Sequence, residues 1–170
     1  KVLKEKVPSL NITATAGLSL GEFTAHAAAG TFDFATGLYL VFQRGSFMEE
    51  ACENTKGAML ALLGGEESAI RELAKECDVD VANLNAPGQI VLSGSAEGIA
   101  DAAAKSKDKG IKRAIPLPVA GAYHSRLMKS AQDKLAVALA AASIQSPKVP
   151  VVCNFEARPV STPEEIRSSP

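Results

Sequence analysis

The sequence predicts an α/β fold in which a small β-α-β-β-α-β unit interrupts a larger α/β domain. Three observations predict it. A strand and a helix meet at a glycine-flanked turn near the N-terminus, strands and helices alternate from about 57 to 118, and a further helix and strand follow. Hydrophobic residues make up 46% of the 170 residues, so a sizeable core can form.

The N-terminal part predicts one strand and two helices. Residues 10–16, LNITATA, predict a short strand because β-branched residues favour extended backbone. A helix is expected over 20–29, with Gly30 as its C-terminal stop. A second helix is expected over 33–54, with Asp33 as its N-cap. Its apolar stripe at helical spacing consists of Phe34, Leu38, Val41, Gly45, Met48 and Cys52.

The middle of the chain predicts the inserted unit. Its expected elements are a strand at 58–64, a helix at 66–77, two strands within 79–94 around Ala86-Pro87-Gly88, a helix at 96–110 and a strand at 111–118. This order is that of the ferredoxin-like motif. We therefore divide the chain into a ferredoxin-like subdomain at 57–118 and a main domain at 1–56 and 119–170. The helix at about 125–142 and the strand at 149–154 belong to the main domain.

Composition and charge narrow the function classes. The net charge of −1 gives no electrostatic basis for binding nucleic acid, and no apolar run approaches the roughly 18 residues of a membrane span. The three cysteines, Cys52, Cys77 and Cys153, are odd in number and far apart, which argues against a disulfide framework or a metal site and for a reducing compartment. Because the final STPEEIRSSP begins a helix and stops, we expect a fragment of a longer protein.

A local basic cluster accompanies the end of the inserted unit. It consists of Lys105, Lys107, Lys109, Lys112 and Arg113. It is either a solvated helix end or a docking patch for an acidic partner.

The first candidate for chemistry is the pentapeptide Gly17-Leu18-Ser19-Leu20-Gly21. It fits G-x-S-x-G between a predicted strand and a predicted helix, the context of a nucleophile elbow. At both glycines we expect bulkier residues to collide with the adjacent chain. The helix that starts at Leu20 directs its N–H groups toward Ser19 and supplies half of an oxyanion site. An ordinary glycine-flanked turn is the alternative.

A serine nucleophile needs a base, and the chain has two histidines, His26 and His124. His26 lies about 10 Å along the same helix from Ser19, which predicts a packing or solvent-facing role. His124 follows the inserted unit in a loop that can face the serine, so it is the candidate base. Arg44, beside the apolar stripe, either pairs with Glu22 or binds a substrate carboxylate.

Four blocks, GLSLGEFTAHAAAGTFDFATGLYLVFQRGSFMEEA, NAPGQIVLSG, LPVAGAYHSRLMKSA and SPKVPVVCNFEARP, resemble the malonyl-CoA:acyl carrier protein transacylase family in family order. The resemblance covers about residues 16–159. It implies an α/β-hydrolase-like acyltransferase core, here incomplete, with an inserted ferredoxin-like subdomain. The roles that it implies are nucleophile for Ser19, base for His124, binding of the malonyl carboxylate for Arg44, backbone oxyanion donor for Leu20, and positions near the cleft for Asn85 and Gln89.

The resemblance further implies ping-pong transfer of malonyl from malonyl-CoA to the phosphopantetheine thiol of acyl carrier protein in fatty acid biosynthesis. It implies no metal, no cofactor beyond these substrates, no nucleic-acid or membrane partner, and a monomer. Two rivals remain, a generic serine esterase and a non-catalytic truncated module that docks acyl carrier protein.

The sequence departs from the family at three places. Leu18 stands where the family usually has histidine; this leucine and AGAYHS resemble plant plastid members, which implies the plastid stroma, with the bacterial cytoplasm or the mitochondrion as alternatives. The Gly-Gln-Gly loop that supplies the other oxyanion donor is absent from this sequence. So is the segment whose glutamine carbonyl orients the histidine.

Overall fold

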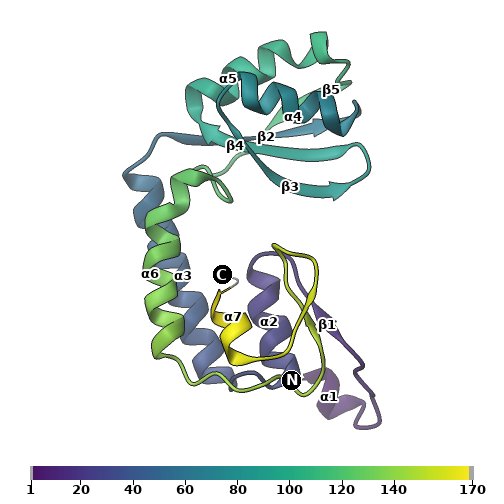
Figure 1. Ribbon diagram of the computed structural model, residues 1–170, viewed down its shortest axis with the longest axis vertical. Coiled ribbons are helices and arrows are strands. Elements are labelled where there is room, and N and C mark those ends of the chain that lie inside the picture. Colours follow the sequence, from purple (N-terminus) through teal and green to yellow (C-terminus); the bar gives the residue numbers. More distant parts are fainter. Residues whose placement is uncertain (1, 169–170) are drawn as a thin grey trace. The chain divides into compact units, whose positions relative to one another are not determined.

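The computed structural model describes residues 2–168, with Lys4 as backbone only. Its contacts group the chain into two compact units, Lys1–Gly45 with Asp133–Pro170, and Ser46–Gln132 (Figure 1). Both units combine helices and strands, which confirms the predicted α/β class. The boundaries that we expect at 57 and 118 stay a prediction.

The first unit contains a three-stranded sheet in the order β1-β6-β7. Strand β6 lies parallel to β1, with Thr15 opposite Val151, and antiparallel to β7. The elements of this unit are α1 (Val2–Lys6), β1 (Thr15–Ala16), α2 (Leu20–Ala29), β6 (Val151–Val152), β7 (Pro159–Val160) and α7 (Pro163–Ser168). The parallel pair matters for function because the turns after β1 and β6 leave the sheet at the same edge.

The strands expected over 10–16 and 149–154 are much shorter than predicted. Extended backbone becomes a strand only where a neighbour supplies hydrogen bonds. Strand β1 pairs with β6 only through Thr15 and Ala16, opposite Val151 and Val152. The β-branched residues before Thr15 therefore favour extension without forming a ladder.

Helix α2 ends as expected, because Gly30 adopts the left-handed conformation with φ 79°. Helix α3 (Phe34–Glu53) begins in the first unit and ends in the second. Asp33 caps it as predicted, and its Oδ1 accepts a hydrogen bond of 2.7 Å from the Thr36 amide.

The predicted apolar stripe of α3 is wrong near its start. Phe34 and Leu38 are 72% and 59% exposed, whereas Leu40 is fully buried. Helix α3 presents Gly37 to Phe32, where an added Cβ would lie 2.8 Å from the ring. The face of α3 that packs in this unit is therefore set by Gly37 and Leu40, which the spacing of large apolar residues does not reveal.

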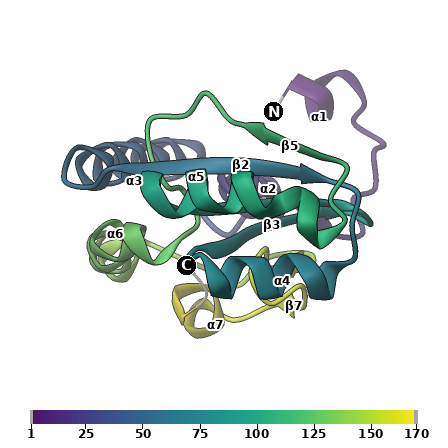
Figure 2. The ribbon, with the colours of Figure 1, turned by 90° about the horizontal axis from the view of Figure 1, so that it is seen from above.

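The second unit contains an antiparallel sheet in the order β3-β4-β2-β5. Its elements are β2 (Gly57–Leu63), α4 (Glu67–Glu76), β3 (Asp80–Ala86), β4 (Gln89–Ser95), α5 (Ala96–Lys105), η1 (Ser106–Lys109), β5 (Arg113–Pro116) and η2 (Arg126–Met128), and α6 (Lys129–Ala141) begins here and ends in the first unit. Helices α4 and α5 cover the same face of the sheet (Figures 1 and 2). They bury Leu60, Leu62, Ile70, Leu73 and Leu92 completely. The strand and helix order predicted for this region is confirmed.

All three cysteines are free thiols, with Cys77 and Cys153 buried and Cys52 half-buried. Across residues 2–168, no helix combines the length and the apolar character that crossing a membrane requires.

Candidate active site

Ser19 occupies a strained turn between β1 and α2. Its backbone has φ 53° and ψ −113°, a region that favours glycine. At Gly17 an added Cβ would lie 2.1 Å from the carbonyl carbon and oxygen of Gly21, so only glycine fits there. At Gly21 the expected collision is wrong, because an added Cβ would have nothing within 4 Å. The close approach therefore constrains the first glycine of the motif and leaves the second free.

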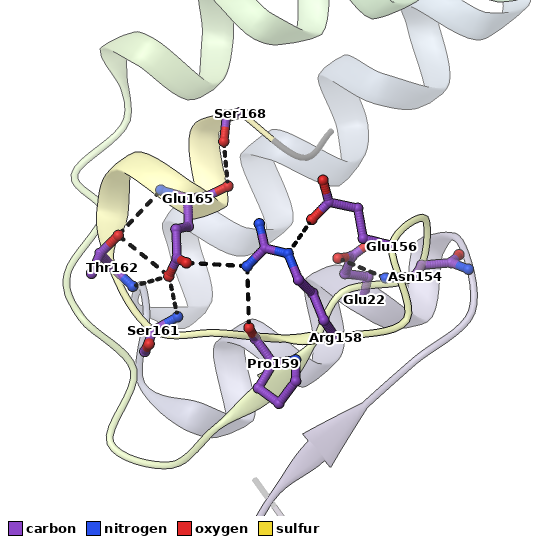
Figure 3. Close-up of polar contacts among 9 residues, drawn as sticks. All are labelled: Glu22, Asn154, Glu156, Arg158, Pro159, Ser161, Thr162, Glu165 and Ser168. Atoms are coloured by element: carbon purple, nitrogen blue, oxygen red, sulfur yellow. Dashed lines mark hydrogen bonds and ion pairs between the residues drawn. The ribbon is translucent and has the colours of Figure 1, made fainter.

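The amide of Ser19 is held by a residue that sequence reasoning missed. Asn154 Oδ1 accepts a hydrogen bond of 2.5 Å from Ser19 N–H. The Asn154 amide in turn donates to Glu22 Oε1 across 3.2 Å (Figure 3). Ser19 follows β1 and Asn154 follows β6, so the parallel pairing of these strands brings the two residues together. The available signal was the asparagine at the end of the predicted strand VPVVCN.

Arg44 reaches Ser19 from α3. Its Nη2 donates a hydrogen bond of 2.7 Å to Ser19 Oγ, and its Cζ lies 6.0 Å from the centroid of the Phe23 ring. Burial raises the pKa of the Glu22 carboxyl, and the attraction of Arg44 lowers this pKa by less. Burial also lowers the pKa of Arg44. The half-buried cation thus contacts the Ser19 hydroxyl and is attracted to Glu22. Binding of a substrate carboxylate by Arg44 stays a prediction.

Leu20 is the first residue of α2. An amide at this position has no acceptor within its own helix. The Leu20 N–H is therefore available to a group that lies at the Ser19 turn.

His124 belongs to the second unit, in the turn that precedes η2. It is exposed and has a left-handed backbone with φ 59°. The turn is firmly held, because Ser125 Oγ donates to the Ala122 carbonyl across 2.7 Å and accepts from Leu127 N–H. Tyr123 packs against a small apolar cluster that includes Ala51 and Met128. His124 therefore lies between Tyr123, which packs against this cluster, and Ser125, whose hydroxyl is hydrogen-bonded on both sides.

The remaining candidates divide between the two units. Asn85 and Gln89 are exposed on the β3–β4 hairpin of the second unit. His26 is 6% exposed in the first unit, with Nδ1 3.1 Å from Thr31 Oγ1, and burial lowers its pKa. Of the two roles expected for His26, packing is confirmed and solvent contact is wrong. Within one unit the structure brings Ser19, Leu20 and Arg44 together, whereas His124, Asn85 and Gln89 lie in the other.

Two members of the basic cluster have carboxylate partners within their own unit. Lys105 pairs with Asp101 at 2.8 Å, and Lys109 pairs with Glu76 at 3.0 Å. These two pairs fit a solvated helix end. In the described part of the chain, no group of three or more His, Cys, Asp or Glu side chains is arranged to hold a metal ion.

Residues 11–167 match the acyl transferase domain family, and the chain belongs to this family. Among its relatives are the malonyl CoA-acyl carrier protein transacylases of Bacillus subtilis and Escherichia coli K12. They are 43% and 42% identical to it over 170 and 158 aligned residues, which cover 96% and 91% of this chain and 54% and 51% of theirs. The chain therefore spans about half the length of these curated relatives.

Solved structures agree. The acyl carrier protein S-malonyltransferase of Vibrio cholerae matches with a TM-score of 0.94 at 34% identity, over 99% of this chain and 56% of that one. A malonyl-transacylase solved in complex with a type II polyketide synthase acyl-carrier protein also matches with a TM-score of 0.94, at 36% identity and the same coverage. The expected resemblance to malonyl-CoA:acyl carrier protein transacylases is confirmed.

Proposed function

We propose that the chain is part of an enzyme that transfers malonyl from malonyl-CoA to the phosphopantetheine thiol of acyl carrier protein in fatty acid biosynthesis. The observation that carries the proposal is the 2.7 Å hydrogen bond from Arg44 to Ser19 Oγ. This hydrogen bond puts a two-pronged guanidinium beside the proposed nucleophile. The free carboxylate of a malonyl group can replace the Ser19 hydroxyl as the partner of Arg44. The names of the relatives support the same substrates.

Each half of the reaction is a balanced acyl transfer. His124 takes the Ser19 proton while Ser19 Oγ attacks the thioester carbonyl, and the Leu20 N–H donates to the resulting oxyanion. The C–S bond breaks, CoA leaves as the thiol with the proton from His124, and a malonyl-serine ester remains. The carrier thiol then gives its proton to His124 and attacks the ester, and Ser19 leaves with that proton. No metal or further cofactor is required.

The architecture proposed with this function is an α/β-hydrolase-like core that contains a ferredoxin-like subdomain at 57–118. The β-α-β-β-α-β order with both helices on one sheet face supports the subdomain. The strand-turn-helix at Ser19 supports the core. Asn85 and Gln89 contribute to the substrate cleft, and the enzyme acts as a monomer. The location proposed with this function is the plastid stroma, which the resemblance of Leu18 and AGAYHS to plant plastid members supports, with the bacterial cytoplasm or the mitochondrion as alternatives.

The serine esterase alternative gives Arg44 no task, because a neutral ester offers no carboxylate. The docking module is the second alternative, and it predicts carrier-protein binding without an acyl-serine. Both make different predictions for the same experiment.

The test is intact-mass measurement of the chain after incubation with malonyl-CoA or acetyl-CoA, followed by addition of holo acyl carrier protein. We expect a malonyl adduct that forms faster than the acetyl adduct, is absent in Ser19→Ala, persists in the exposed control Ser46→Ala, and is discharged by the carrier protein. Equal adducts from both thioesters would favour the esterase. Carrier binding with no adduct would favour the docking module.

A further inference from the structure

The side chain of Asn154 is committed to the nucleophile turn. Its Oδ1 accepts a 2.5 Å hydrogen bond from the Ser19 amide, across a sequence separation of 135 residues. An amide N–H at a strained turn needs a fixed acceptor, because the backbone otherwise relaxes toward a more favourable φ. The side-chain oxygen of Asn154 supplies that acceptor.

Asn154 is itself anchored from the other side of the turn. Its own amide donates to Glu22 Oε1 across 3.2 Å, and Glu22 lies on the first turn of α2, the helix that Ser19 precedes (Figure 3). The chain therefore closes a ring of contacts: Ser19 to the Asn154 side chain, the Asn154 backbone to Glu22, and Glu22 back to Ser19 through α2. The ring fixes the start of α2, where the Leu20 amide lies, relative to Ser19.

The loop that carries Asn154 is braced at its base. Cys153 N–H donates to the Arg158 carbonyl across 2.9 Å, and Ala157 N–H donates back to the Cys153 carbonyl across 3.0 Å. The Arg158 side chain binds Glu165 of α7 at 3.1 Å (Figure 3). Glu165 also accepts hydrogen bonds from the backbone amides of Ser161 and Thr162. The loop is thus closed at its base by the hydrogen bonds of Cys153 and linked to α7 through Arg158 and Glu165.

We infer that Asn154 is a positioning residue that holds the Ser19 backbone in its reactive conformation and keeps Ser19 Oγ and the Leu20 N–H in register for acyl transfer. Asn154 touches neither the acyl group nor the thiol. It acts through the amide of Ser19, so its loss lowers the acylation rate much more than it changes the apparent KM for the thioester. The inference rests on the proposed function for its kinetic part, while its structural part concerns Ser19 alone.

The test compares Asn154→Leu with Asn154→Asp in the 170-residue chain. Leucine has similar volume but cannot accept the Ser19 hydrogen bond, whereas a carboxylate oxygen can. For Asn154→Leu we expect malonylation of Ser19 to slow about 100-fold, with most of the change in the rate constant. Asn154→Asp is expected to restore most of the rate. Asn54→Leu is the control, because Asn54 is exposed and bonds only locally to the Glu50 carbonyl.

The second readout is the Ser19 amide proton in two-dimensional NMR. Loss of the acceptor shifts it upfield and speeds its exchange with solvent in Asn154→Leu but not in Asn154→Asp. If the wild-type chain forms no malonyl-serine, the proposed function fails for this chain, and the amide measurement still decides this inference. If Asn154→Leu does not fold, Asn154→Ser, whose shorter side chain cannot reach the amide, replaces it. An unchanged Ser19 amide, or a wild-type acylation rate without the acceptor, overturns the inference.

Discussion

Arg44 Nη2 lies 2.7 Å from Ser19 Oγ, although the two residues are 25 positions apart on different elements. The cation comes from α3 and the hydroxyl from the turn before α2. Arg44 is half-buried, and the loss of solvation at this position lowers its pKa. A cation that has already lost part of its water binds a carboxylate more strongly than an exposed one does. The contact therefore joins the proposed nucleophile to the residue that we propose to bind the substrate carboxylate.

Replacement of Arg44 should reduce transfer from malonyl-CoA much more than transfer from acetyl-CoA. For Arg44→Ala we expect the kcat/KM for malonyl-CoA to fall by roughly 100-fold, equivalent to about 3 kcal/mol, because the proposed half-buried pair between the guanidinium and the malonyl carboxylate is lost. The kcat/KM for acetyl-CoA should fall by less than about tenfold. The measurement is the ratio of the two kcat/KM values, with the exposed Arg71→Ala as control; an unchanged ratio would remove Arg44 from substrate selection.

The backbone of Ser19 should be strained, so glycine should be better tolerated than alanine at this position. Both Ser19→Gly and Ser19→Ala lose the hydroxyl, but only glycine adopts φ 53° without cost. We expect Ser19→Gly to be more stable than Ser19→Ala by about 1 kcal/mol, after its greater unfolded-state entropy is included. Urea unfolding at pH 7 measures the difference. Equal stabilities would mean that the turn stores no strain.

The two glycines of the motif should respond oppositely to alanine. At Gly17 the new Cβ would meet the backbone of Gly21 at 2.1 Å, so Gly17→Ala should destabilise the protein by about 3 kcal/mol and abolish acylation. At Gly21, inside α2 and with open space, alanine should be neutral or stabilising by up to about 1 kcal/mol. Thermal unfolding of the two variants side by side checks this, and similar losses in both would contradict it.

Glu22 should make stability depend on pH. Burial raises its folded pKa above the ordinary value of 4.5, despite the opposing contacts with Asn154, Cys153 and Arg44. The contribution of the neutral carboxyl is fully present below the unfolded pKa and is lost as pH rises through the folded pKa. Relative to Glu22→Gln, the wild type should therefore lose stability as pH increases above 4.5.

Urea unfolding between pH 4 and 7 measures this difference. Glu67→Gln is the control, since Glu67 forms an exposed pair with Arg71 at 2.7 Å. A Glu22→Gln curve that stays parallel to the wild-type curve throughout would refute the prediction.

Substitutions of the two histidines should have different effects, one on the acylation rate and the other on stability. His124→Gln should slow acylation of Ser19 by about 100-fold or more, because the proposed general base is lost. His26→Gln should leave the acylation rate of the folded protein unchanged and cost about 1 kcal/mol of stability through the Thr31 contact.

Because burial lowers the pKa of His26, its contribution to stability is present above 6.5 and is lost as pH falls through the folded value. Single-turnover kinetics and urea unfolding distinguish the two roles. An acylation defect in His26→Gln alone would reverse the assignment.

The sequence by itself determined the turns, caps and helix ends, because these features depend on residues that are neighbours in the chain. The G-x-S-x-G turn at Ser19, the stop at Gly30, the cap at Asp33 and the hairpin at Gly88 all follow from local backbone preferences. The family followed as well, because its motifs are short and occur in order.

Only the tertiary structure decided which distant groups meet. The Ser19 amide finds Asn154 through the pairing of β1 with β6, and α3 buries Leu40 while Phe34 is exposed. The close approach at Gly17 and the open space at Gly21 look the same in the sequence and differ in the packed turn. Strand pairing and packing bring together residues more than a hundred positions apart. The backbone preference of one residue does not identify the distant residue that it will contact.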